Sequence, residues 1–257
     1  MEYLIISLAA FFTSALTLFS GFGLGTMLMP IFALFFPIDI AIALTAIVHL
    51  LNNLFKLGLL GKYADSSVVI RFGLPAIFSA YIGAKLLTWI SDLNPIFSYQ
   101  LFGHSYAVSP VKLIIALLII VFALLDIIPT LMKISFSKKL LPVGGIFSGF
   151  FGGLSGHQGA LRSAFLLRCG LTKEGFIATG IVIGCIVDVA RMIGYSSHFT
   201  SFAVTENLYL LTAAVLSAFL GAYLSRKLLK RVTMNFVQIM VSVLLFAIAI
   251  GLALGII

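Results

Sequence analysis

Two stretches without any charged side chain limit what this chain can fold into. The first runs from Tyr3 to Ile38 and the second from Val232 to Ile257. Each exceeds the roughly 20 apolar residues that one membrane-spanning helix needs. Charged residues make up 9% of the chain and hydrophobic residues 61%, whereas soluble domains contain roughly 25% charged residues. The sequence therefore predicts an all-α polytopic membrane protein, with the lipid bilayer as its surroundings.

The net charge of +8 does not indicate a nucleic-acid partner. Phosphate binding needs clustered, exposed cations, whereas here Lys and Arg lie in short runs between apolar segments. We also expect no cleaved signal peptide, because Glu2 makes the start acidic and the first apolar run is too long. Cys169 and Cys185 both lie in apolar stretches and are expected to be packed thiols. We expect no metal and no cofactor.

Charge-poor windows divide the chain into eight apolar blocks, which form two similar sets of four. The segments SAYIGAKLL (79–87) and SAFLGAYLS (217–225) are identical at five of nine positions. We therefore expect two four-element repeats, residues 1–135 and 136–257, a construction that is common in secondary transporters. The eight blocks are residues 3–36, 38–60, 68–90, 109–130, 140–169, 174–196, 205–225 and 233–256.

The loop charges indicate that the two repeats are inverted in the membrane. Cytoplasmic loops carry an excess of Lys and Arg. Between the second and third blocks, the first repeat has Lys62 and Arg71, while the matching link of the second repeat is poor in cations. The next link shows the opposite bias, with four cations within residues 226–231 of the second repeat. We expect both termini outside and the basic clusters in the cytoplasm.

Blocks 1 and 5 are too long and too rich in glycine for one continuous spanning helix. As one helix, residues 3–36 would measure about 50 Å against a hydrocarbon core of about 30 Å. Their middles are SGFGLGT (20–26) and GGLSGHQG (152–159), and glycine disfavours helix. We predict that each block is a broken helix or re-entrant hairpin, followed by three transmembrane helices. A continuous, steeply tilted helix is the alternative.

The two breaks predict an anion site near the bilayer midplane. Non-helical backbone at membrane depth must be buried in protein or line a wet cavity. The half-helix after each break would present N–H groups and a positive dipole end to an anion. Alternatively, the tip glycines only allow close helix packing, the role that we assign to Gly145, Gly149 and Gly153. The break residues assigned to the substrate site are Gly21, Gly23, Gly25, Thr26, Gly156, His157, Gln158 and Gly159.

Arg162 lies one turn after the second break, where a cation in the membrane needs a partner or a purpose. We expect it to bind substrate, and the alternative is a structural ion pair with Asp188. Asp188 and Arg191 are three residues apart and could pair with each other, leaving Arg162 free. We therefore assign Asp188 and Arg191 a structural or coupling role.

Block 2 carries polar residues at helical spacing, from Thr45 through His49 and Asn53 to Lys56. Such a face either lines a polar pathway or joins helices through hydrogen bonds. We assign His49 and Asn53 to the pathway and expect Lys56 to snorkel to the cytoplasmic edge. At the second break, His157 could bind substrate, carry a proton or make an ordinary hydrogen bond.

Three segments resemble the TauE/SafE family of sulfite and organosulfonate exporters. They are GFGLGTMLMPIFALFFP (21–37), ALTAIVHLLNNLFK (43–56) and GGLSGHQGALRSAFLLRCGLTKEGFIATG (152–180), and the likeness extends over essentially the whole chain. The resemblance implies a four-plus-four duplicated fold and a multi-pass exporter of the bacterial inner membrane. It also implies that the small anionic substrate contains sulfur, while a homodimer is one possible assembly.

We thus expect a secondary transporter that exports a small sulfur-containing anion by alternating access around the midplane site. A passive anion channel and an exporter of a non-sulfur organic anion are the alternatives. An enzyme is not expected, because the chain has no GxSxG motif, no HExxH motif and no paired carboxylates at a usable spacing.

Overall fold

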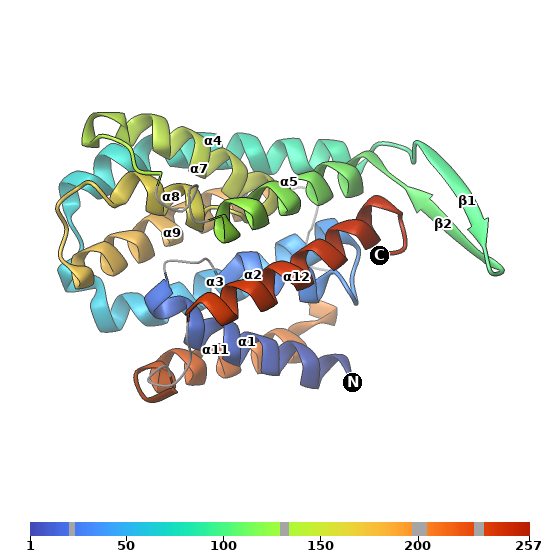
Figure 1. Cartoon of the computed structure of the whole chain (residues 1–257), viewed down its shortest axis with the longest axis horizontal. Helices are drawn as coiled ribbons and strands as arrows, with labels where there is room; N and C mark the ends of the chain where they lie inside the picture. Colours follow the sequence, from blue (N-terminus) through green and yellow to red (C-terminus); the bar gives the residue numbers. More distant parts are fainter. Residues whose placement is uncertain (21–23, 129–133, 197–204, 229–233) are drawn as a thin grey trace.

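The computed structural model describes the chain apart from residues 21–23, 129–133, 197–204 and 229–233. It is a bundle of helices with one β-hairpin projecting from one end (Figure 1). In chain order the helices are α1 (Glu2–Ser20), α2 (Leu24–Phe32), α3 (Ile38–Leu60), α4 (Ser66–Ser91), α5 (Pro110–Ile127), α7 (Leu141–Ser155), α8 (Gly159–Leu166), α9 (Lys173–Tyr195), α11 (Leu208–Leu228) and α12 (Met234–Ala253). Two 3-10 turns, η1 (Gly61–Tyr63) and η2 (Lys138–Leu140), precede α4 and α7.

Four helical segments of the described chain are long and apolar enough to cross a membrane. They are Ile38–Tyr63, Ser66–Ser91, Lys173–Tyr195 and Leu208–Ser225. The outer faces of the bundle expose large apolar side chains, with Phe78 69%, Leu117 61% and Tyr223 70% exposed. Such faces suit lipid rather than water, since acyl chains solvate them without cost. The predicted class of helical multi-pass membrane protein is therefore confirmed.

One short hairpin, which the sequence analysis does not predict, is added to the helical bundle. Strands β1 (Phe97–Leu101) and β2 (His104–Val108) pair antiparallel in the link between α4 and α5. At the turn, Phe102 and Gly103 have φ values of 51° and 79°, the positive φ pair that two-residue hairpin turns favour. The Tyr99 hydroxyl donates to the carbonyl of Leu254 at 2.6 Å, which joins the hairpin to the end of α12.

Block 5 is divided into two helices, as predicted, with the break between Ser155 and Gly159. In block 1 the described helices are α1 and α2, and the predicted break at residues 21–23 lies outside the described residues. Gly156 ends α7 with a φ of 80°, and its N–H donates to the Gly152 carbonyl at 3.0 Å. Only glycine adopts this left-handed conformation without a Cβ penalty.

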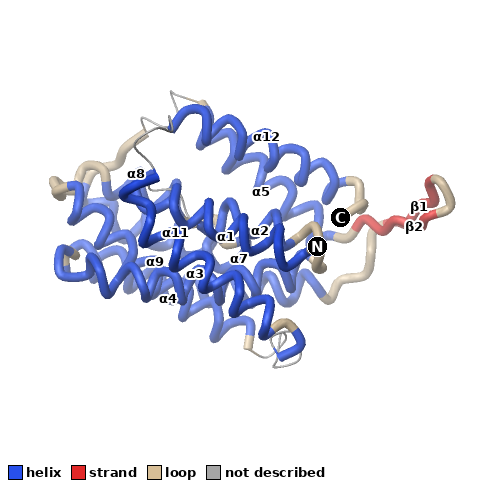
Figure 2. Tube along the Cα trace, turned by 90° about the horizontal axis from the view of Figure 1, so that it is seen from below, coloured by secondary structure: helices blue, strands red, loops and turns tan. Residues whose placement is uncertain are grey.

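The two ends of the bundle differ in what they carry. Both termini lie at the end that bears the hairpin, and the two views agree on this (Figures 1 and 2). The turns η1 and η2 and the first residues of α9 lie at the opposite end (Figure 1). These elements include Lys62, Lys138, Lys139 and Lys173. The basic end is the one that the loop charges predict to be cytoplasmic.

Glycines hold α4 and α7 unusually close together. A Cβ on Gly145, Gly149 or Gly153 of α7 would lie 2.0–2.5 Å from a backbone carbonyl oxygen of α4. These oxygens belong to Phe72, Ala76 and Ala80, at the same four-residue spacing as the glycines. The packing role predicted for the three glycines is confirmed.

Close packing at a glycine occurs in two pairs of helices, α4 with α7 and α11 with α1. In both pairs, the two helices come from different halves of the chain. A Cβ on Gly83 of α4 would lie 2.2 Å from the carbonyl oxygen of Phe150 in α7. A Cβ on Gly221 of α11 would lie 2.1 Å from the carbonyl oxygen of Phe11 in α1. Gly83 and Gly221 are the matching glycines of the repeated segments 79–87 and 217–225. In each half of the chain, the helix that carries this glycine therefore packs on a helix from the other half.

Candidate anion site

The start of α2 and the break between α7 and α8 lie in contact inside the bundle. A Cβ on Gly25, the second residue of α2, would lie 3.3 Å from the carbonyl oxygen of Gly156. The same Cβ would lie 3.9 Å from Cδ2 of His49 on α3. Residues predicted from three separate segments thus come together at one place. Gly21 and Gly23 lie outside the described residues.

Asp188 of α9 is the centre of a buried polar cluster beside the breaks. The residue is fully buried, and its Oδ2 lies 2.6 Å from Nδ1 of His49. Its Oδ1 lies 2.8 Å from Nη2 of Arg191 and accepts from Nε2 of Gln158 at 3.3 Å. Asn53 Nδ2 is a further donor to Oδ2, at 3.4 Å. One carboxylate therefore connects α3, α9 and the second break.

Arg162 contacts Gln158 and is not paired with Asp188. Its Nη1 donates to Oε1 of Gln158 at 3.2 Å, so Gln158 stands between the guanidinium and the carboxylate. Asp188 instead pairs with Arg191, the partner three residues along α9. Within the described part of the chain, no carboxylate lies within 4 Å of Arg162, whose side chain is half-buried. The predicted alternative, an Arg162–Asp188 ion pair, is wrong.

The side chain of Arg162 lies close to α9, because α9 carries glycine at the two positions that face the guanidinium. A Cβ on Gly180 would lie 3.4 Å from Nε of Arg162, and one on Gly184 would lie 3.4 Å from its Nη1. Gly184 also faces Asn53, whose Nδ2 would be 2.9 Å from such a Cβ. The sequence analysis missed both glycines, although their four-residue spacing is the signal for a close contact across one helix face.

The other predicted break residues have different surroundings. Nδ1 of His157 lies 3.0 Å from the Ser155 carbonyl oxygen, and its ring stacks on Phe122 with 5.2 Å between centroids. Nε2 of His157 has no hydrogen-bond partner among the described residues. Thr26 and Gly159 are buried in the first turns of α2 and α8. Thus Gln158, not His157, connects the second break to Asp188.

Lys56 corrects the sequence analysis. It was expected to snorkel to the cytoplasmic edge, but its side chain is only 3% exposed. Its Nζ lies 3.5 Å from the Ser14 carbonyl oxygen and from Oγ1 of Thr17, both on α1. The lysine is therefore enclosed between α1 and α3.

The charges at the breaks favour an anion. Arg191 balances Asp188, which leaves the guanidinium of Arg162 as an additional positive charge one turn into α8. The free N–H groups of the first turn of α8 add the positive end of a helix dipole. Arginine presents paired N–H donors at fixed spacing, which match the oxygens of a small oxyanion.

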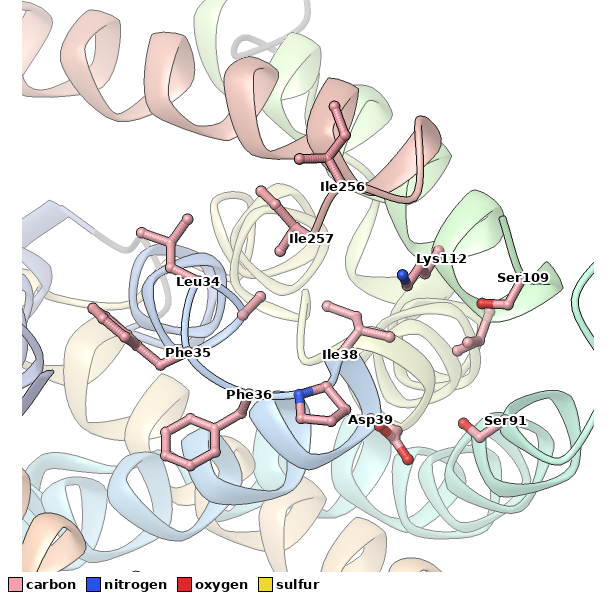
Figure 3. Close-up of a pocket in the computed structure, with 13 residues that line it drawn as sticks. Leu34, Phe35, Phe36, Ile38, Asp39, Ser91, Ser109, Lys112, Ile256 and Ile257 are labelled. Atoms are coloured by element: carbon pink, nitrogen blue, oxygen red, sulfur yellow. The ribbon is translucent and has the colours of Figure 1, made fainter. Parts of the chain in front are cut away.

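A separate cavity lies at the end of the bundle that carries the termini. Its volume is about 480 Å³, and it is bounded by residues 33–39, the end of α4 and the beginning of α5. Asp39, Ser91, Ser109 and Lys112 are its polar lining residues (Figure 3). The ammonium of Lys112 donates to the carbonyls of Ala107 and Gly255, each at 3.2 Å. None of the predicted site residues lines this cavity.

These features define a helical multi-pass membrane protein in which a glycine-rich helix break contacts the start of α2 beside the buried Arg191. Compared with known protein families, residues 6–252 match the family described as Sulfite exporter TauE/SafE. The chain belongs to this family, which consists of membrane transporters. The resemblance predicted from the sequence is thereby confirmed over nearly the whole chain. Searches of curated proteins and of solved structures gave no match.

Proposed function

We propose that this protein exports a small sulfur-containing anion, such as sulfite or an organosulfonate, by alternating access around the two helix breaks. The contact between Gly25 and the carbonyl of Gly156 carries the proposal. It brings the start of α2, from the first half of the chain, against the second break, and Arg162 lies one turn beyond that break on α8. Membership of the family indicates that the substrate contains sulfur. The positive charges beside the breaks indicate that it is an anion.

Two corresponding glycine contacts between the halves of the chain support an inverted repeat. Gly83 packs on Phe150 as Gly221 packs on Phe11, so α4 and α7 correspond to α11 and α1. Two matching contacts of this kind are expected when a pseudo-two-fold axis relates the repeats. In such an arrangement one pair of helices can rock against the other while the breaks stay at the centre, which is how alternating access works.

Binding would use Arg162, Gln158 and the start of α8. The guanidinium holds two substrate oxygens, and the N–H groups at the start of α8 face a third. The Gln158 side chain, held by Asp188, fixes the position of Arg162 before substrate arrives. His49 and Asn53 fix Asp188 in turn, so the cluster is a rigid support for the guanidinium of Arg162.

The sidedness follows from charge. The end with η1 and η2 holds several lysines and would face the cytoplasm. We place the protein in the bacterial inner membrane with both termini outside. The membrane potential, negative inside, then favours the outward movement of an anion by about 2.3 kcal/mol per charge per 100 mV.

Transport of radiolabelled sulfite into or out of proteoliposomes tests the proposal. Arg162→Gln should weaken apparent affinity about ten-fold or more, since a hydrogen bond to a charged group is worth about 1.5–3 kcal/mol. Arg162→Lys should restore only part of it, because lysine lacks the fork. Arg168→Gln, on an exposed arginine six residues further along, is the matched control and should transport normally.

Two results would contradict the proposal. Unchanged sulfite affinity in a folded Arg162→Gln protein would exclude the guanidinium from the site. A channel would be favoured if an imposed potential or ion gradient never drives the anion against its own electrochemical gradient. Transport rates far above those of carriers would point the same way.

A further inference from the structure

A second polar cluster lies between α1 and α3, separate from the one around Asp188. It consists of Ser14 and Thr17 on α1 and of Asn52 and Lys56 on α3, and all four residues are buried. Lys56 lies seven residues beyond His49, so it is about 10 Å further along α3, towards the basic end of the bundle. None of the hydrogen bonds around Asp188 includes a member of this cluster.

Asn52 presents an unpaired donor within this cluster. Its Oδ1 accepts from Oγ of Ser14 at 3.0 Å. Its Nδ2 has no hydrogen-bond partner among the described residues, although Asn52 is 0% exposed. A buried amide donor without a partner is costly and is rare in native proteins. An acceptor is therefore missing at this place.

Lys56 presents an uncompensated charge beside the same serine. Its Nζ reaches only neutral oxygens, the Ser14 carbonyl and Oγ1 of Thr17, and both lie at 3.5 Å, the outer limit of a hydrogen bond. In the part of the chain that the structure describes, no carboxylate lies within 4 Å of Nζ. Charged groups in the membrane interior are normally paired, so Lys56 and Asn52 each present an unsatisfied donor next to Ser14.

We propose that Lys56 and Asn52, with the hydroxyls of Ser14 and Thr17, bind a small anion at a second site. One anion would accept from Nδ2 of Asn52 and neutralise the ammonium of Lys56 at once. Its source is either the exported oxyanion, on its way from the basic end to the breaks, or chloride held as a fixed counter-ion. The identification of this anion as the exported oxyanion rests on the proposed function, whereas the existence of the site does not.

Calorimetric titration of the purified protein with sulfite, in a gluconate buffer without chloride, tests the second site. The wild-type protein should bind two sulfite ions, Arg162→Gln and Lys56→Gln should each bind one, and the double variant none. Lys56→Arg keeps the charge and should retain both binding events. Asn52→Ala should weaken one event about ten-fold, the effect of losing a hydrogen bond to a charged group.

A parallel titration with chloride separates the two sources. If chloride occupies the Lys56 site and sulfite does not displace it, the site holds a counter-ion. If sulfite binds there and chloride competes weakly, the site belongs to the transport route. Either result supports the site, provided that binding disappears in Lys56→Gln.

The inference is overturned if Lys56→Gln, eluting as a single folded species, binds as many anions as the wild-type protein with the same affinities. Should Lys56→Gln fail to fold, Asn52→Ala decides, since unchanged binding in that variant also overturns the inference. Failure of the proposed function looks different, because Arg162→Gln would then bind like the wild-type protein while Lys56→Gln loses one ion.

Discussion

Replacing Gly153 by alanine tests whether α4 and α7 pack as closely as described. The added Cβ would lie 2.0 Å from the carbonyl oxygen of Ala80, 2.8 Å from its carbonyl carbon and 2.9 Å from its Cα. All three are backbone atoms, so no side-chain rotation can relieve the overlap. The two helices would have to separate by more than an ångström. The Tyr195 hydroxyl, which donates to the carbonyl of Gly153, would be displaced with them.

Two effects of opposite sign set the size of the change. Alanine favours a helix over glycine by about 0.5–1 kcal/mol, while overpacking a close contact costs about 1–3 kcal/mol or more. Because the overlap is with backbone, the upper part of that range applies, and we expect a net loss of about 1–3 kcal/mol. Gly58→Ala in α3 is the matched control, since nothing lies within 4 Å of its added Cβ. It should be neutral or slightly stabilising.

Thermal unfolding in a mild detergent, followed by circular dichroism, measures the difference. A domain of this size changes Tm by about 2–4 °C per kcal/mol, so Gly153→Ala should melt several degrees below Gly58→Ala. Gly149→Ala should also melt lower, since its Cβ would lie 2.5 Å from the Ala76 carbonyl oxygen. Equal melting temperatures for Gly153→Ala and Gly58→Ala would refute the close packing of α4 and α7.

Two further predictions concern the buried ion pair and the membrane topology. Asp188→Asn or Arg191→Gln alone should each cost about 3–5 kcal/mol, because an unpaired charge stays buried. The double variant should melt above both, and additive losses in a double-mutant cycle would contradict the pairing. Single cysteines at residue 65 should resist a membrane-impermeant maleimide in intact cells, while one at residue 2 should react, and the reverse result would invert the topology. The native Cys169 gives little background, because burial raises the pKa of its thiol.

The features that the sequence predicted correctly depend on local patterns. Glycines at a spacing of four residues marked the contact of α7 with α4, and a glycine-rich centre marked the break between α7 and α8. Charge-free stretches of known length marked the helices, because the bilayer fixes how long they must be. Each of these signals is complete within about 30 residues of sequence, so it does not depend on how distant segments pack.

Most of the features that the sequence did not predict are contacts between segments that lie far apart in the chain. His49 and Asp188 are 139 residues apart, and nothing in either segment specifies that they meet. Lys56 was expected to extend towards water because its own helix ends nearby, but α1 covers it through Ser14 and Thr17. The hairpin is an exception, because both of its strands lie within the short link between α4 and α5. Its Tyr99–Tyr106 pair, with 5.5 Å between ring centroids, is a cross-strand contact typical of strands.

Gln158 determines which arginine remains available to an anion. Its Nε2 donates to Asp188 and its Oε1 accepts from Arg162. Gln158 therefore lies between the carboxylate and the guanidinium and is hydrogen-bonded to both. Gln158→Glu preserves the shape but places a carboxylate next to Arg162, with which an incoming anion must then compete. We expect sulfite affinity to fall ten-fold or more, and the rise in melting temperature that sulfite produces to shrink accordingly. Gln158→Leu removes both hydrogen bonds but adds no charge, so its affinity should fall less. If a folded Gln158→Glu protein binds sulfite as tightly as the wild-type protein, Arg162 is not the cation that holds the anion.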